Sequence, residues 1–325
     1  MTIKRPFRFS VQAFSAGSGD EWADLARRAE DLGYSTLFAT DHYFGPGSIA
    51  DDSRHRPVDL APVAAIATAA AVTTGLRVGC RVFCVDYHHP VVLAKEMATL
   101  DLLSGGRVEI GIGAGWVAAE YGGLGIAMDR AGLRIQRLGE AVAVLDAHFG
   151  GGAIDFAGDH FQVHGFEGLP RPVQRPRPPI MIGGGSPRVL RLAGRMADIV
   201  SINFDNSTGA IGPASVAGSH IAATEAKLQW IREGAGDRLA DIELEIGAYF
   251  VAVGPAAGEA AVAIAGRFGV DPAELAAHPH ALLGSVDEVC DRLEDRRDRF
   301  GFSYVCVPQR NLDEFAPVVA RLAGS

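Results

Sequence analysis

A carboxylate and an imidazole stand next to each other at Asp41 and His42, where a short run rich in β-forming residues ends. Such a pair could work as a general acid and base, or the carboxylate could orient the imidazole. The alternative is a core histidine whose ring nitrogens bond to backbone groups. Because enzymes built on parallel barrels place their chemistry at strand ends, we favour the functional interpretation.

A second run of chemical interest, Gly183–Gly185 followed by Ser186 and Pro187, connects a predicted strand to a predicted helix. Three glycines let the backbone come close to a ligand, and serine followed by proline is typical of a helix start. Backbone N–H groups at such a helix N-terminus bind anions, above all phosphate. The alternative is a flexible turn, since glycine-rich turns are common.

The other strand ends are poor in reactive side chains. None of the three lysines ends a predicted strand, which argues against a Schiff-base aldolase. No paired carboxylates end neighbouring strands, as a glycosidase would need, and too few acids and imidazoles converge for a metal centre. A site rich in bare backbone instead indicates that a bound cofactor carries the chemistry. Trp116 could stack on a planar ring or close the barrel mouth.

These residues are positioned by a regular alternation of β-rich runs and helical stretches. We predict eight strands, at residues 7–14, 36–40, 77–83, 108–113, 180–182, 199–204, 243–253 and 304–307. Helical sequence follows each strand, so the α/β pattern favours a closed (β/α)8 TIM barrel over an open doubly wound sheet. Loop insertions are expected at 117–128, 150–178, 205–214 and 269–284, within a single domain spanning residues 1–325.

The composition restricts the partners. Lys plus Arg total 30 against 39 for Asp plus Glu, giving a net charge of −9 without a basic cluster, which argues against nucleic acid. The longest uncharged run, 60–76, is mostly Ala and Thr and contains Pro62, so we expect a buried helix and no membrane partner. Polar residues interrupt any signal-peptide core in the first residues, and we therefore expect a cytoplasmic protein.

Several motifs occur in an order that is known from one protein family. They are Phe38-Ala39-Thr40-Asp41-His42, His89-Pro90, the run from Ala98 to Arg107, the run from Gly111 to Trp116 with Glu120-Tyr121, and the run from Pro179 to Gly185. In this order they resemble the luciferase-like monooxygenase superfamily, and most closely its actinobacterial oxidoreductases that use the deazaflavin coenzyme F420. The resemblance covers nearly the whole chain and implies a TIM barrel whose mouth holds the flavin-type ring.

The resemblance also implies roles for individual residues. Asp41 and His42 would lie beside the ring and the substrate as catalytic residues. The third strand would back the ring with a bulge that often carries a non-prolyl cis peptide. Cofactor contacts are expected from Cys80, Arg81, Val82, Ala114, Gly115, Trp116, Val117, Gly183, Gly184, Gly185 and Ser186. No metal is expected.

By the same resemblance, the function is hydride transfer between coenzyme F420 and a small organic substrate, in a homodimer. One alternative is a two-component FMN-dependent monooxygenase that uses O2 and needs a flavin reductase as partner. Another is a barrel that binds a flavin without catalysis. Some sugar-phosphate dehydrogenases of the family carry a catalytic Glu where this chain has Trp116, which argues against a sugar phosphate and leaves the proton donor open.

Overall fold

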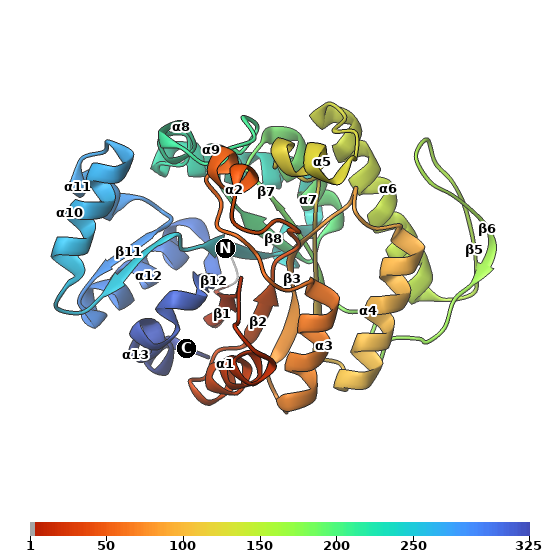
Figure 1. Cartoon of the computed structure of the whole chain (residues 1–325), viewed down its shortest axis with the longest axis horizontal. Helices are drawn as coiled ribbons and strands as arrows, with labels where there is room; N and C mark the ends of the chain where they lie inside the picture. Colours follow the sequence, from red (N-terminus) through yellow and green to blue (C-terminus); the bar gives the residue numbers. More distant parts are fainter. Residues whose placement is uncertain (1–3) are drawn as a thin grey trace.

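Eight parallel strands close into a barrel in the computed structural model of the chain, which describes residues 4–325 (Figure 1). The strands are β1 (Arg8–Gln12), β2 (Thr36–Ala39), β3 (Arg77–Cys84), β4 (Val108–Gly113), β7 (Ile180–Gly184), β8 (Ile199–Ile202), β9 (Glu243–Gly247) and β12 (Phe302–Pro308). Their order around the barrel is β1-β12-β9-β8-β7-β4-β3-β2. The predicted TIM barrel is therefore confirmed.

Helices surround the barrel and bury their apolar faces against the strands (Figure 1). They are α1 (Gly19–Asp31), α3 (Pro62–Val72), α4 (Pro90–Ser104), α6 (Ala131–Gly150), α7 (Pro187–Met196), α9 (Ile221–Ala235), α12 (Val286–Phe300) and α13 (Leu312–Leu322). The starts of α4 and α7 follow from proline in the first helical position, where its missing N–H costs nothing. Ser285 and Glu288 form the reciprocal capping box that begins α12.

Smaller elements fill the insertions. They are α2 (Ser48–Ser53), α5 (Ala118–Leu124), the antiparallel pair β5 (Ala153–Ala157) and β6 (Gln162–Glu167), α8 (Pro213–Ala217), α10 (Ala257–Phe268), α11 (Pro272–Ala277) and β11 (Ala281–Gly284), with 3-10 turns at Gly236–Ala240 and Gln309–Asn311. The β5–β6 hairpin projects from the side of the barrel beyond α4 and α6 (Figure 1). In the described part of the chain, no helix combines the length and the apolar character that crossing a bilayer requires.

The predicted seventh strand, 243–253, is wrong as a single element. It divides into β9 in the barrel and β10 (Phe250–Val253), which leaves the barrel and pairs in parallel with β11. The division follows from a change of hydrogen-bond partner. Ala248 still donates its N–H to the barrel strand at the Cys306 carbonyl, whereas Tyr249 and Phe250 donate theirs to the His280 carbonyl. Because residues 246–253 are without charge on both sides of the division, their composition does not mark this exit from the barrel.

Charged side chains fill the barrel interior below the site. Glu109 is fully buried, and its carboxylate accepts hydrogen bonds from Arg8, from Arg77 at 2.7 Å and from the Tyr304 hydroxyl at 3.0 Å. Burial opposes ionisation, but the charges of Arg8 and Arg77 hold the pKa of Glu109 below its usual value. This paired layer forms a polar base beneath the strand ends.

Candidate functional site

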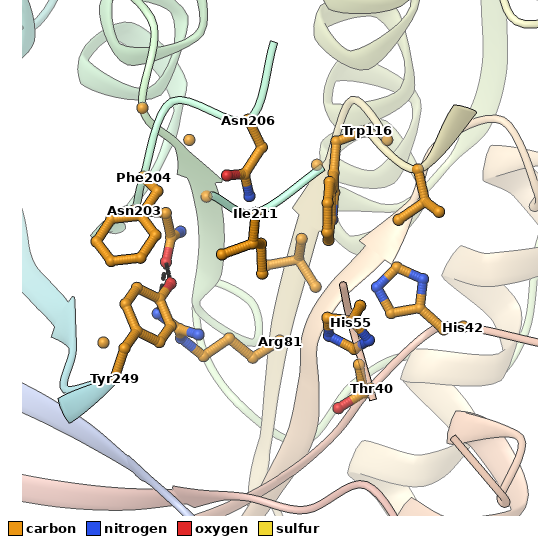
Figure 2. A pocket seen from close by; sticks show the side chains of 18 of the residues that line it. Thr40, His42, His55, Arg81, Trp116, Asn203, Phe204, Asn206, Ile211 and Tyr249 are labelled. Atoms are coloured by element: carbon orange, nitrogen blue, oxygen red, sulfur yellow. Dashed lines mark hydrogen bonds between the residues drawn. The ribbon is translucent and has the colours of Figure 1, made fainter. Parts of the chain in front are cut away.

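A cavity of about 450 Å³ opens at the C-terminal ends of the barrel strands. This volume lies within the range of roughly 300–1,000 Å³ that is typical of ligand pockets. Every expected site residue lines it except Cys80, so the topology brings together positions from 41 to 186. Figure 2 shows His42, His55 and Trp116 on one side of the cavity and Arg81, Asn203 and Tyr249 on the other.

Cys80 lies outside the cavity, contrary to the expectation. Its side chain is fully buried in the core between the barrel and the helices. The reason is the alternation of side chains along a strand, which turns Arg81 toward the barrel interior and Cys80 away from it. Burial, followed by the charge of Asp41, raises the pKa of the Cys80 thiol well above its usual value. Cys80 can therefore contribute only its backbone to a ligand.

The third strand carries the expected irregularity. The Arg81–Val82 peptide bond is cis, and the pairing of β3 with β4 shifts register between Cys80 and Phe83. This bulge turns the Val82 side chain inward. A Cβ on Gly113 would lie 2.7 Å from Val82, and one on Gly183 would lie 3.3 Å from it. Glycine at these positions therefore leaves room for Val82 and keeps this part of the cavity free of larger side chains.

Arg81 belongs to a buried polar network beneath the cavity (Figure 2). Its guanidinium donates to Glu245 Oε1 at 3.1 Å, to Gln12 Oε1 at 3.1 Å and to Asn203 Oδ1 at 2.8 Å. The hydroxyl of Tyr249 donates to the same Asn203 oxygen. Burial opposes the charge on Arg81, but Glu245 more than offsets this and raises the pKa of Arg81. The network fixes the positions of polar groups drawn from four strand ends.

The imidazole of His42 is held by a carboxylate from a distant segment. His42 Nδ1 lies 2.7 Å from Glu120 Oε2 on α5, and the other Glu120 oxygen accepts the backbone N–H of Tyr43. Glu120 is buried, with 1% exposure. When Nδ1 donates to this carboxylate, Nε2 is left unprotonated and can accept a proton from a ligand. Glu120 thus positions the imidazole for proton transfer.

Asp41 does not orient His42, although the two are adjacent in sequence. Its Oδ2 accepts the backbone N–H of Cys84 at 2.7 Å and lies 2.9 Å from His88 Nε2. Its Oδ1 is buried and has no partner among the described residues. Because an unpaired buried carboxylate oxygen is costly, Oδ1 is suited to accept a hydrogen bond from a ligand in the cavity. Asp41 is therefore a candidate contact for a cofactor or substrate.

Aromatic rings surround His42. The ring centroid of His55 lies 4.6 Å from that of His42, and Trp116 packs edge-on against both, at 6.0 and 5.8 Å. His55 Nδ1 lies 2.8 Å from the carbonyl oxygen of Arg56. Burial, followed by the charge of His42, lowers the pKa of His55 to about 3, so this imidazole is neutral at physiological pH. Trp116 forms part of the wall beside His42.

The loop after β7 presents backbone to the cavity, but its glycines also have a packing role. A Cβ on Gly184 would lie 2.3 Å from Val189, and one on Gly185 would lie 2.3 Å from the Phe204 carbonyl oxygen. The Ser186 side chain makes no capping hydrogen bond to α7, contrary to our expectation. The Ser186 hydroxyl and the first N–H groups of α7 are therefore available to an anion.

The prediction of site residues from sequence missed five that line the cavity or hold its residues. They are Gln12, His55, Glu120, Asn203 and Tyr249. Glu120 lies in an expected insertion and His55 in a loop, so no strand end points to them. Asn203 lies near the end of the predicted strand 199–204, and this position was the signal that could have identified it.

A closed parallel barrel with a ligand-sized cavity at the carboxyl ends of its strands, and a histidine held in that cavity, is the architecture of a TIM-barrel protein that binds its ligand at the barrel mouth. Comparison with known proteins makes the assignment specific. Residues 2–262 match the family described as luciferase-like monooxygenase. The chain belongs to this family.

Two similar proteins are F420-dependent glucose-6-phosphate dehydrogenases. The one from Microbacterium testaceum is 33% identical over 61% of this chain and 56% of its own length. The one from Nakamurella multipartita is 32% identical over 59% of this chain and 55% of its own length. The chain thus spans a little over half the length of these relatives.

Solved structures share the fold at low identity. The coenzyme F420-dependent tetrahydromethanopterin reductase from Methanopyrus kandleri has a TM-score of 0.74 and 20% identity, over 98% of this chain and 99% of that one. The long-chain alkane monooxygenase LadA has a TM-score of 0.77 and 17% identity, over 98% of this chain and 92% of that one. These likenesses establish the barrel architecture and do not distinguish between cofactors.

Proposed function

We propose that the protein is an F420-dependent oxidoreductase that transfers a hydride between the deazaflavin and a small organic substrate. The observation that carries this proposal is the cavity, in which backbone-rich walls from β4 and β7 face an imidazole held by a buried carboxylate. Such a site can bind and orient a cofactor and can transfer a proton, but its side chains are poor in other reactive groups. The names of two relatives favour F420 as that cofactor.

The residues of the cavity fit such a group. Val82, set among glycines, offers a face without long side chains on which a planar ring can lie. The N-terminus of α7 beside Ser186 offers N–H groups and a positive dipole end to a phosphate. Asp41 Oδ1 offers a buried acceptor without a partner among the described residues. We therefore assign the ring to the Val82 side and the phosphate to the start of α7.

In the mechanism, the deazaflavin supplies a hydride acceptor or donor. His42 moves the accompanying proton through Nε2, while Glu120 keeps the ring oriented and stabilises its protonated form. The aromatic wall of Trp116, Phe44 and neutral His55 limits water around the imidazole. Arg81 and its network hold the polar groups beneath the cavity in fixed positions.

An FMN-dependent monooxygenase is the second candidate. It is supported by the description of the family to which the chain belongs, luciferase-like monooxygenase. FMN also ends in a phosphate, which the start of α7 would bind in the same way. This function would require O2 and a flavin reductase. A barrel that binds its flavin without catalysis would share the same cavity.

Titration of the purified protein with F420 and with FMN separately distinguishes these candidates. We expect saturable changes in cofactor absorbance and an affinity for F420 at least about tenfold higher, a difference of about 1.4 kcal/mol. Tighter binding of FMN would transfer the assignment to the monooxygenase, and failure of both to bind would overturn the proposal. Reduction of bound F420 by small organic compounds then tests for turnover, which a non-catalytic barrel would not show.

The phosphate assignment predicts the effect of a negative charge at Ser186. Ser186→Asp should lower cofactor affinity at least about tenfold, because a charge-assisted hydrogen bond worth roughly 1.5–3 kcal/mol is replaced by repulsion. The melting temperature should not fall, since Asp at a helix N-cap is as favourable as Ser. Ser186→Asn is the matched neutral control and should stay close to the parent. A folded Ser186→Asp protein with unchanged affinity would remove the phosphate from this helix.

Assembly and location remain proposals. We propose a homodimer, supported by three exposed apolar side chains on one helix, Val92 near the start of α4 and Leu102 and Leu103 near its end. A cytoplasmic location and a small-molecule partner are likewise proposed, and neither nucleic acid nor a membrane is assigned a role.

A further inference from the structure

The cavity carries positive charge in a protein that is acidic overall. The chain has a net charge of −9, yet six arginines line the cavity. Arg81 and Arg134 are held by hydrogen bonds within the protein, and the other four are at positions 54, 56, 267 and 310. Of the acids that line the same cavity, Asp41 pairs with His88 and Glu120 with His42. The third, Asp205, accepts the backbone N–H of Ser207 on the side of β8. Among the described residues, none of these three acids therefore forms an ion pair with the four arginines.

Three of these arginines lie together on one side of the cavity. The guanidinium of Arg56 lies 5.0 Å from the ring centroid of Phe14, just beyond the end of β1. Arg310 follows β12, the neighbour of β1, and Arg267 ends α10. Partial burial, followed by the charge of Arg56, lowers the pKa of Arg310, and Arg267 adds to this lowering while Glu314 opposes it. Like charges are thus held close to each other.

Their donors are largely unused. Among the described residues, none of the three forms an ion pair, and the only side-chain hydrogen bond that any of them donates is a long one of 3.4 Å from Arg310 to the Tyr249 carbonyl. A guanidinium has five N–H donors in a planar fork that matches the oxygens of carboxylates and phosphates. Unpaired like charges at a cavity mouth cost stability, and an anion there would relieve that cost.

We propose that Arg56, Arg267 and Arg310 bind the anionic group, a carboxylate or a phosphate, of the substrate. That this anion belongs to the substrate rests on the proposed function. In the eight-stranded barrel β7 is the fourth neighbour of β1 in either direction, so the start of α7 lies across the cavity from Phe14 and Arg56. The cofactor phosphate and the substrate anion would therefore occupy opposite sides.

The proposed anion subsite lies on the same side of the cavity as His42. The ring centroid of His55 lies 4.6 Å from that of His42 and 5.8 Å from that of Phe14. The rings of Phe14 and His55 thus connect Arg56 to His42 along one side of the cavity. A substrate anchored by its anionic group at the arginines would extend along this side of the cavity toward His42, which describes a small organic anion.

The test uses inorganic phosphate and malonate as probes, titrated calorimetrically into protein saturated with F420, so that the cofactor already occupies its own phosphate site. We expect one of the two anions to bind, and the better of them identifies the anion class. Arg56→Ala with Arg310→Ala should weaken that binding at least about tenfold, as should Arg267→Ala with Arg310→Ala. Arg195→Ala with Arg232→Ala, at two exposed arginines outside the cavity, removes the same charge and should change nothing.

The affinity for F420 is measured on the same variants. We expect it to stay within about twofold of the parent, because the arginines lie across from the cofactor phosphate. Loss of F420 binding in the arginine variants would mean that these residues hold the cofactor tail, which overturns the inference. Absence of anion binding to the parent, or equal binding by parent and variants, would also overturn it and would leave the F420 titration intact. If F420 fails to bind the parent, the proposed function fails instead, and the titration repeated without cofactor still tests the arginines.

Discussion

Replacing His42 by Ala should lower turnover by a factor of about 10²–10⁴, which is the usual contribution of a positioned acid or base. Its Nδ1 is held 2.7 Å from Glu120, so Nε2 is the nitrogen available to a substrate in the cavity. The loss should appear in kcat at saturating substrate, measured as the rate of change of deazaflavin absorbance, with cofactor affinity nearly unchanged. Turnover equal to that of the parent would show that His42 only packs against the aromatic wall.

A second variant separates the positioning role of Glu120 from the chemistry of His42. Glu120→Gln keeps a hydrogen-bond acceptor at the same place but removes the charge that stabilises a protonated imidazole. It should lower kcat less than His42→Ala does, because the amide still accepts the Nδ1 hydrogen bond and orients the ring but no longer stabilises the positive charge that the imidazole gains when it takes up a proton. Added imidazole should partly restore the His42→Ala activity and leave Glu120→Gln unchanged.

Replacing Arg81 by Met should cost about 3–5 kcal/mol of unfolding free energy, because it leaves the buried carboxylate of Glu245 without its counter-ion. Urea unfolding of both proteins measures the difference. Burial already raises the pKa of Glu245, with Arg81 opposing that rise, so removal of Arg81 raises it further. The folded variant then holds a proton that the unfolded chain releases, and its stability should fall as pH rises from the ordinary Glu pKa toward the raised one.

Two controls keep this result interpretable. Arg28→Met breaks an exposed ion pair with Asp313 and should cost no more than about 1 kcal/mol. Combining Arg81→Met with Glu245→Met removes both buried charges and should recover much of the loss. A cost for Arg81→Met as small as that of Arg28→Met would mean that water reaches Glu245 and screens it.

The alternation of β-rich and helical runs predicted all eight barrel strands, because the tendency of a run to form a strand or a helix depends on the residues of that run. It also predicted where Pro90 and Pro187 begin their helices, since a proline restricts its own backbone. The exit of the chain from the barrel after Gly247 was not predictable, because it depends on the carbonyl of His280, more than thirty residues away along the chain.

Site residues at strand ends were predictable from the sequence. Hydrogen-bond partners that lie far away along the chain were not. His42 and Arg81 follow from their strands, but Glu120 lies 78 residues from His42 and Glu245 lies 164 residues from Arg81. Neighbours in sequence were also misleading, since Asp41 holds His88 and leaves His42 to Glu120. The glycines after β7 favour phosphate binding in sequence, yet Gly184 and Gly185 are also required by contacts with Val189 and Phe204.

The strands and the insertions form different parts of the cavity, and this has a consequence for protein engineering. The face that we propose for the ring and the buried polar network come from the barrel strands, whereas the wall near the arginines comes from α10 and from the loop that carries His55 and Arg56. If the proposed function holds, a library that varies only this loop and α10 would therefore diversify the accepted compounds while leaving the proposed coenzyme site unchanged. The same boundary makes these segments natural units for grafting between barrels of the family.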